Sequence, residues 1–134
     1  MKKFIADTNF YLRFLLRDVE SQAKKTEVRL KEAKAGKIKI LFTDEVILEM
    51  GFVLKSNYLI ERGKIAEELL RLVKTTYLEI ENRNLWVTAL SKYAETKISL
   101  LDVFLFTKAN QDGYEVLSYD EDFQKLQKIV RDQE

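Results

Sequence analysis

Four short runs with the character of β-strands constrain the fold of this 134-residue chain more than any other feature. Segments with helical patterns separate them, and the apolar or alternating residues within the runs predict strands. Strands separated by one or two helices favour a parallel sheet covered by helices on both faces, which places the chain in the α/β class. The four runs are KFIA at 3–6, KIKILFT at 37–43, YLEIE at 77–81 and YEVLSYD at 114–120.

The segments between and after these runs predict the helices. Gly36 and Gly113 follow two of them, as expected of the residue just past a helix end, and Thr43 and Asn82 are candidate N-caps. No proline, glycine- and serine-rich linker or repeat divides the sequence, so residues 1–134 are expected to form one domain. The predicted helices span 9–16, 21–35, 43–54, 64–74, 84–95, 98–113 and 121–130.

The chain contains neither cysteine nor histidine. Disulfides, zinc–thiolate sites and imidazole chemistry are therefore excluded, and any catalysis depends on carboxylates, Lys, Tyr, Ser/Thr or a metal held by oxygen. The 23 Lys and Arg against 22 Asp and Glu leave a formal charge of +1, so an anionic partner must meet a local basic patch. No apolar run approaches the roughly eighteen residues that span a membrane, and we expect a soluble, cytoplasmic protein.

Four acidic residues in apolar surroundings are expected at one edge of the sheet. Asp7 and Asp120 follow predicted strands, whereas Glu49 and Asp102 lie near the starts of two predicted helices. In parallel α/β folds, the carboxyl ends of strands and the amino ends of helices share the edge where ligands bind. Each acid also has a purely structural interpretation: a turn cap, a solvent-facing side chain, a capping-box acid three residues after Ser99, or an acid opening the last helix.

Taken together, the four carboxylates predict a divalent cation. An acid among apolar residues is costly to desolvate unless it is paired or binds a metal, and the apolar runs around Asp7, Glu49 and Asp102 contain no Lys or Arg. Four carboxylates at one site also repel one another unless a cation neutralises them. All-oxygen coordination without histidine or thiolate favours Mg²⁺ or Mn²⁺ over zinc.

These residues give the sequence a resemblance to the PIN-domain nucleases, in particular the small VapC-type toxins of toxin–antitoxin systems. The resemblance runs through FIADTN, DEVILEMGFVL, LLDVFLFTKA and VLSYDEDF in the family's order. It implies a PIN-like three-layer α/β/α fold with a central parallel sheet of four to five strands. It also implies a Mg²⁺- or Mn²⁺-dependent endoribonuclease toxin of a type II (VapBC-like) system, with a cognate antitoxin as inhibitor and a homodimer as assembly.

The resemblance assigns roles to individual residues. The family's catalytic acidic quartet is matched by Asp7, Glu49, Asp102 and Asp120, with Asp7, Asp102 and Asp120 as the expected metal ligands. The supporting positions are matched by Asn9 and Ser118, which are expected to orient the acids, and by Asp122, an additional acid found in many members.

Basic residues near the N-terminus are candidates for RNA contact, although such side chains are more often simply solvated. They are Arg13, Arg17, Lys24 and Lys25. The alternative function is a catalytically silent PIN-like module that binds RNA or protein. Two other α/β classes fit less well: a phosphorelay receiver needs paired acids after the first strand, and a haloacid-dehalogenase-type phosphatase needs an aspartate where Asn9 stands.

Overall fold

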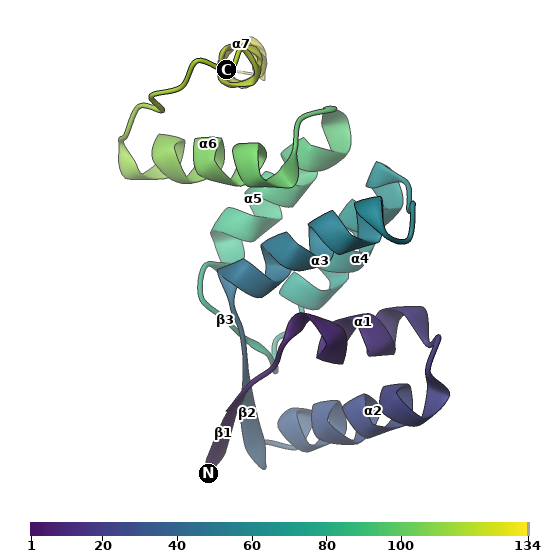
Figure 1. Ribbon diagram of the computed structural model, residues 1–134. Helices are drawn as coiled ribbons and strands as arrows, with labels where there is room; N and C mark the ends of the chain where they lie inside the picture. Colours follow the sequence, from purple (N-terminus) through teal and green to yellow (C-terminus); the bar gives the residue numbers. More distant parts are fainter. Residues whose placement is uncertain (134) are drawn as a thin grey trace.

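The computed structural model describes residues 1–133 as a small parallel sheet with seven helices (Figure 1). Every predicted helix is present, with ends within three residues of the predicted ones. In chain order the elements are β1 (Lys2–Ile5), α1 (Thr8–Leu16), α2 (Glu20–Lys34), β2 (Ile38–Phe42), α3 (Asp44–Ser56), α4 (Arg62–Val73), β3 (Glu79–Ile80), α5 (Arg83–Glu95), α6 (Leu100–Asp112) and α7 (Asp122–Gln133).

The sheet is parallel, as the alternation of strands and helices predicts. Its order is β1-β2-β3, and β1 lies at an edge. Lys2 pairs with Ile38 and Ile5 with Leu41, while Phe42 pairs with Ile80 in the two-residue β3. The α/β class and the parallel sheet are thus confirmed, with three strands among the residues described.

The predicted strand at 114–120 is not part of this sheet. Residues 114–118 have no regular secondary structure, although their alternating pattern suits a strand. A strand needs a neighbour that completes its backbone hydrogen bonds, and none of the described strands lies beside this segment. The local pattern is therefore present, but the pairing that would make it a strand is absent from this structure of residues 1–133.

Helix ends follow the polar and glycine residues that the sequence places there. The Asp7 carboxylate accepts a hydrogen bond from the Phe10 N–H (3.0 Å) and caps α1, and Thr43 accepts from the Val46 N–H (3.4 Å) at the start of α3. Gly36 and Gly113 adopt φ values of 77° and 78° just past α2 and α6, a conformation that glycine tolerates without strain.

The α5 start differs from the expectation for Asn82. This residue holds the N-cap position, but its side chain makes no capping hydrogen bond and instead donates to the Asp44 carboxylate (2.7 Å). The same carboxylate accepts from the indole N–H of fully buried Trp86 (2.8 Å). Asp44 thereby ties α3 to α5, a tertiary role beyond the favourable helix-dipole position that its place in the first turn provides.

Aromatic stacking organises the core on both sides of α3. Tyr11 stacks on Phe42 with ring centroids 4.1 Å apart, and Trp86 stacks on Phe104 at 4.4 Å. The Tyr11 hydroxyl is buried and has no hydrogen-bond partner among residues 1–133, and burial raises its pKa above the ordinary value. Such an unsatisfied group costs free energy because it loses water without gaining a partner.

Tyr11→Phe is therefore expected to leave the protein equally stable or to stabilise it by about 1 kcal/mol, because it removes the unsatisfied hydroxyl and keeps the ring stack. Urea unfolding followed by far-UV circular dichroism measures the difference. Tyr77→Phe, at a half-buried tyrosine, is the matched control and should change stability little. A loss above roughly 1 kcal/mol in Tyr11→Phe would show that the hydroxyl has a partner.

Helix α6 approaches α3 closely and carries the C-terminal part of the chain away from β1. A Cβ atom at Gly51 would lie 2.6 Å from Leu100 Cδ2, so the glycine permits this approach. The segment after α6 and helix α7 lie at the end of the molecule opposite the N-terminus of β1 (Figure 1). None of the helices described in residues 1–133 is long and apolar enough to cross a membrane.

Candidate functional site

Three carboxylates from the C-terminal third of the chain meet. Asp102 lies in the first turn of α6, Asp120 in the loop that follows residues 114–118, and Asp122 at the start of α7. One oxygen of each lies within 4.8 Å of the others. Asp102 and Asp122 are half-buried and Asp120 is exposed, so the group is open to solvent and to a large substrate.

Local hydrogen bonds hold the backbone of all three residues. The Asp102 N–H donates to the hydroxyl of the N-cap Ser99 (3.2 Å). The Asp120 N–H donates to Ser118 Oγ (2.9 Å), and the Asp122 N–H donates to Asp120 Oδ1 (2.9 Å). Ser118 thus contacts the backbone of Asp120, and the supporting role that the resemblance gives it stays a prediction.

The three carboxylates fit a hard divalent cation. Mg²⁺ holds oxygen ligands at roughly 2.1 Å, so any two of its ligands lie at most about 4.2 Å apart. The observed limit of 4.8 Å is slightly larger, and small side-chain rotations close the difference. The only nearby cation that an ion pair identifies within residues 1–133 is Lys125, whose Nζ lies 3.7 Å from Asp122 Oδ1. One such lysine at an exposed site leaves most of the negative charge of three carboxylates uncompensated.

The other two members of the predicted quartet lie outside this group. Asp7 lies two residues after the end of β1, where it caps α1 and lines a groove of about 830 Å³ along β1 and α2. Glu49 is exposed on α3, and Asn9 is exposed on α1. The structure therefore brings together Asp102, Asp120 and Asp122, and the four-acid site stays a prediction. Asp7 lies apart from the three clustered acids because residues 114–120, which lead into Asp120, do not lie against β1.

The basic residues predicted to contact RNA fall into two groups. Arg13 donates two hydrogen bonds to Asp18 (2.6 and 2.5 Å), and Arg17 pairs with Glu20 (2.6 Å) and Glu27. These carboxylates raise the pKa of both guanidinium groups, which hold their charge but are already engaged. The ammonium groups of α2 differ, because Lys24 and Lys25 are exposed and have no ion pair with residues 1–133.

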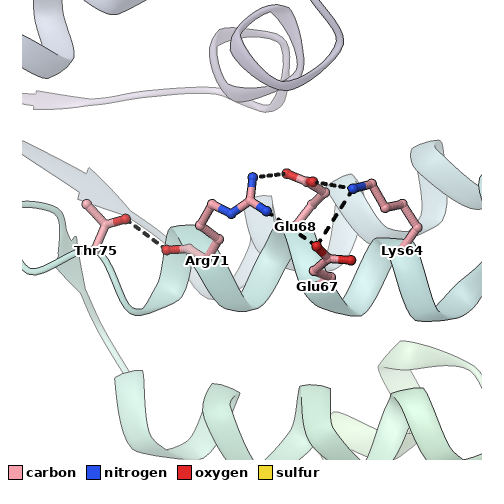
Figure 2. A network of polar contacts seen from close by, with 5 residues as sticks. All are labelled: Lys64, Glu67, Glu68, Arg71 and Thr75. Atoms are coloured by element: carbon pink, nitrogen blue, oxygen red, sulfur yellow. Dashed lines mark hydrogen bonds and ion pairs between the residues drawn. The ribbon is translucent and has the colours of Figure 1, made fainter.

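Charges on α4 are also balanced locally. Figure 2 shows Lys64 and Arg71 on either side of Glu68, with Nζ–Oε1 and NH1–Oε2 distances of 3.0 and 3.2 Å, and both cations also reach Glu67. The Thr75 hydroxyl continues the network by donating to the Arg71 carbonyl (2.9 Å). Exposed pairs one turn apart on a helix contribute modestly to stability, and this face of α4 offers little free positive charge to a polyanion.

Sequence reasoning missed two basic residues in a groove that Asp120 also lines. Lys128 and Arg131 of α7 line a second groove, of about 890 Å³, together with Asp120 and Ser118. Their spacing of three residues places both on one face of the helix, which is the signal that could have identified them. The groove thus places cations that suit a phosphate in the same lining as Asp120, one of the three clustered carboxylates.

One comparison identifies a family. The pattern of the family described as PIN domain matches residues 4–129, which is nearly the whole chain. No curated protein and no solved structure matches this chain.

Proposed function

This chain belongs to the PIN domain family, and we propose that it is a Mg²⁺- or Mn²⁺-dependent endoribonuclease. PIN domains are generally nucleases and typically bind divalent metals. The observation that carries the proposal is the meeting of Asp102, Asp120 and Asp122, because Asp120 also lines a groove that contains basic side chains. A chain without histidine or cysteine has these carboxylates as its natural hard-metal ligands.

In this proposal different residues bind the metal ion and the RNA. Asp102, Asp120 and Asp122 hold the cation, and Asp7 and Glu49 complete the acidic site. When bound, the cation supplies positive charge opposite the attacked phosphate and promotes ionisation of the attacking water. Lys128 and Arg131 hold neighbouring RNA phosphates by charge-assisted hydrogen bonds, and Lys24 and Lys25 extend the contact.

The narrower biological role follows the resemblance in the sequence. We propose a toxin of a type II, VapBC-like toxin–antitoxin system that acts in the cytoplasm, forms a homodimer and is inhibited by a cognate antitoxin. The support is the ordered set of motifs FIADTN, DEVILEMGFVL, LLDVFLFTKA and VLSYDEDF. Growth arrest on expression of the wild type, and its absence with Asp7→Asn, tests this role in cells.

RNA cleavage tests the biochemical proposal. A pool of structured RNAs is incubated with wild type or Asp7→Asn in Mg²⁺, in Mn²⁺ or in EDTA. Asparagine caps helices about as well as aspartate, so Asp7→Asn keeps the α1 cap and should keep the fold. Fragments with 5′-phosphate ends that need the metal and vanish in the variant support the proposal. Metal-independent RNA binding without cleavage by well-folded wild type favours the catalytically silent module instead.

Mg²⁺ is expected to raise the thermal midpoint of unfolding, because an ion that binds only the folded state stabilises it by mass action. For a dissociation constant of about 1 mM, 10 mM Mg²⁺ adds about 1.4 kcal/mol, a rise of roughly 3–6 °C for a domain of this size. Differential scanning fluorimetry against NaCl of equal ionic strength measures the shift. Equal midpoints in the two salts would contradict metal binding by the wild type.

A further inference from the structure

The outer edge of β1 is unpaired within the part of the chain that the structure describes. β1 pairs with β2 on one side, and no strand formed by residues 1–133 lies on the other. Ile5 in this edge strand is 71 % exposed, and an apolar groove runs beside it, lined by Phe4, Ala6 and Val28 among others. An exposed strand edge of this kind offers unsatisfied backbone groups to another strand.

Residues 114–120 are a strand-like segment without a partner. Leu117 is 98 % exposed and Tyr114 73 %, although the alternation of YEVLSY suits a strand in a sheet. Glu115, Val116 and Leu117 make no backbone hydrogen bond with another described residue. The molecule thus presents both an open sheet edge and an unused strand.

The start of helix α6 is anchored so that the segment after the helix, residues 114–120, points away from β1 of the same chain. The Arg62 guanidinium stacks on Tyr93, donates to the Tyr93 carbonyl (3.0 Å) and donates to the Ile98 carbonyl (2.5 Å), which fixes the connection before α6. Leu100 then packs against Gly51, and Phe104 stacks on Trp86. Figure 1 shows the segment after α6 at the far end of the molecule from the start of β1.

The exposed surface is larger than a monomer of this mass should have. A folded monomer of 15.8 kDa is expected to expose about 7,300 Å², whereas this chain exposes 8450 Å². An excess of roughly 1,100 Å² per chain gives two copies enough surface for an interface of standard size or larger. Leu101 and Leu105, one turn apart on α6, add to the apolar part of that surface.

We propose that two copies exchange their C-terminal segments. Residues 114–120 of one copy add to the free edge of β1 in the other as a fourth, parallel strand, and the exchange is reciprocal, which closes a two-fold dimer. The groove is lined by charges of both signs, Lys25 and Arg29 with Asp7 and Glu32, and Arg29 already pairs with Glu32 (3.5 Å). Backbone pairing and apolar contact therefore hold the incoming strand. Parallel pairing brings Asp120 of the partner to the end of β1, where Asp7 lies.

On the premise of the proposed nuclease function, each active site is then composite. Asp7 and Glu49 come from one copy, whereas Asp102, Asp120 and Asp122 come from the other. This arrangement accounts for the separation of the two sets of acids within a single chain. It also makes the dimer a requirement for activity.

The assembly is tested without reference to activity. Light scattering after size-exclusion chromatography should give twice the chain mass of 15.8 kDa for the wild type. Leu117→Asp should be monomeric, because it places a charge in the exchanged strand, and circular dichroism checks that it stays folded. Leu59→Asp, at an 84 % exposed leucine between α3 and α4, is the matched control and should stay dimeric. A monomeric wild type, or a dimer that survives Leu117→Asp, would overturn the exchange.

Mixing two inactive variants tests the composite site. Asp7→Asn and Asp120→Asn are unfolded and refolded together, so that about half of the dimers contain one chain of each kind. Each mixed dimer then has one site with both aspartates intact, and about one quarter of wild-type cleavage should return. No recovery despite mixed dimers would place each site within one chain and refute the composite arrangement. A wild type that never cleaves RNA would refute the nuclease function instead, while the mass measurement still decides the exchange.

Discussion

Asp102→Asn is expected to lower RNA cleavage by at least roughly 100-fold, since loss of even an outer-shell partner of a metal site costs about 10- to 100-fold. The substitution removes one negative charge from the group of three carboxylates and leaves the shape of the side chain unchanged. The helix cap also remains, because it uses the Asp102 backbone N–H and the Ser99 hydroxyl. Initial rates on one labelled RNA at saturating Mg²⁺ measure the effect.

Asp112→Asn supplies the matched control for this substitution. It makes the same chemical change at the exposed last turn of the same helix, outside the acidic group. Cleavage should stay within about two-fold of wild type, and the removal of an acid from a helix C-terminus should stabilise the protein slightly. If both variants lose activity equally, a general charge effect explains the loss and the special role of Asp102 is wrong.

Trp86→Ala is expected to destabilise the protein by about 3–5 kcal/mol, the range observed when a large buried aromatic residue is truncated. Trp86 is fully buried, stacks on Phe104 and donates to Asp44, so its loss opens a cavity and removes a link between α3 and α5. A domain of this kind has a total stability of about 5–15 kcal/mol, so the variant should unfold at much lower urea concentration. Far-UV circular dichroism follows the transition, since Trp86 is the only tryptophan.

Trp86→Phe separates the contribution of the aromatic stack from that of the hydrogen bond to Asp44. It keeps an aromatic ring against Phe104 but removes the donor to Asp44, which retains its hydrogen bond from Asn82. A loss of about 1–3 kcal/mol is expected, smaller than that of Trp86→Ala. If Trp86→Ala costs under about 1 kcal/mol, the stack and the hydrogen bond do not hold α5 in place as described.

Much of the fold could be predicted because its signals are local. Thr43, Gly36 and Gly113 stand where α3 begins and where α2 and α6 end, since capping and a left-handed backbone depend on the residue itself. The parallel sheet could also be predicted, because the alternation of strands with helices is visible in the order of the segments along the sequence. Asn82 departed from its expected role because the Asp44 carboxylate, 38 positions earlier, offers it a tertiary hydrogen bond.

The candidate site could be predicted only in part, because it depends on pairing between distant segments. Asp102, Asp120 and Asp122 converge through α6, its following loop and α7, and the Ser118 hydroxyl accepts a hydrogen bond from the Asp120 N–H. Asp7 joins such a group only when a strand at 114–120 lies beside β1. Nothing in the local sequence says whether that strand comes from the same chain or from another. Lys128 and Arg131 were missed because the groove that they line forms only when α7 packs against α6.

A cleavage time course in which the metal is removed and then restored tests most directly whether these carboxylates form a metal-dependent nuclease site. Wild-type protein cuts an RNA pool in Mg²⁺, EDTA in excess of the metal is added midway, and Mg²⁺ in excess of the EDTA follows. Cleavage is expected to stop with EDTA, to resume with Mg²⁺ and to leave 5′-phosphate ends throughout. Cleavage that continues at the same rate in EDTA would contradict a metal-dependent nuclease built on these carboxylates.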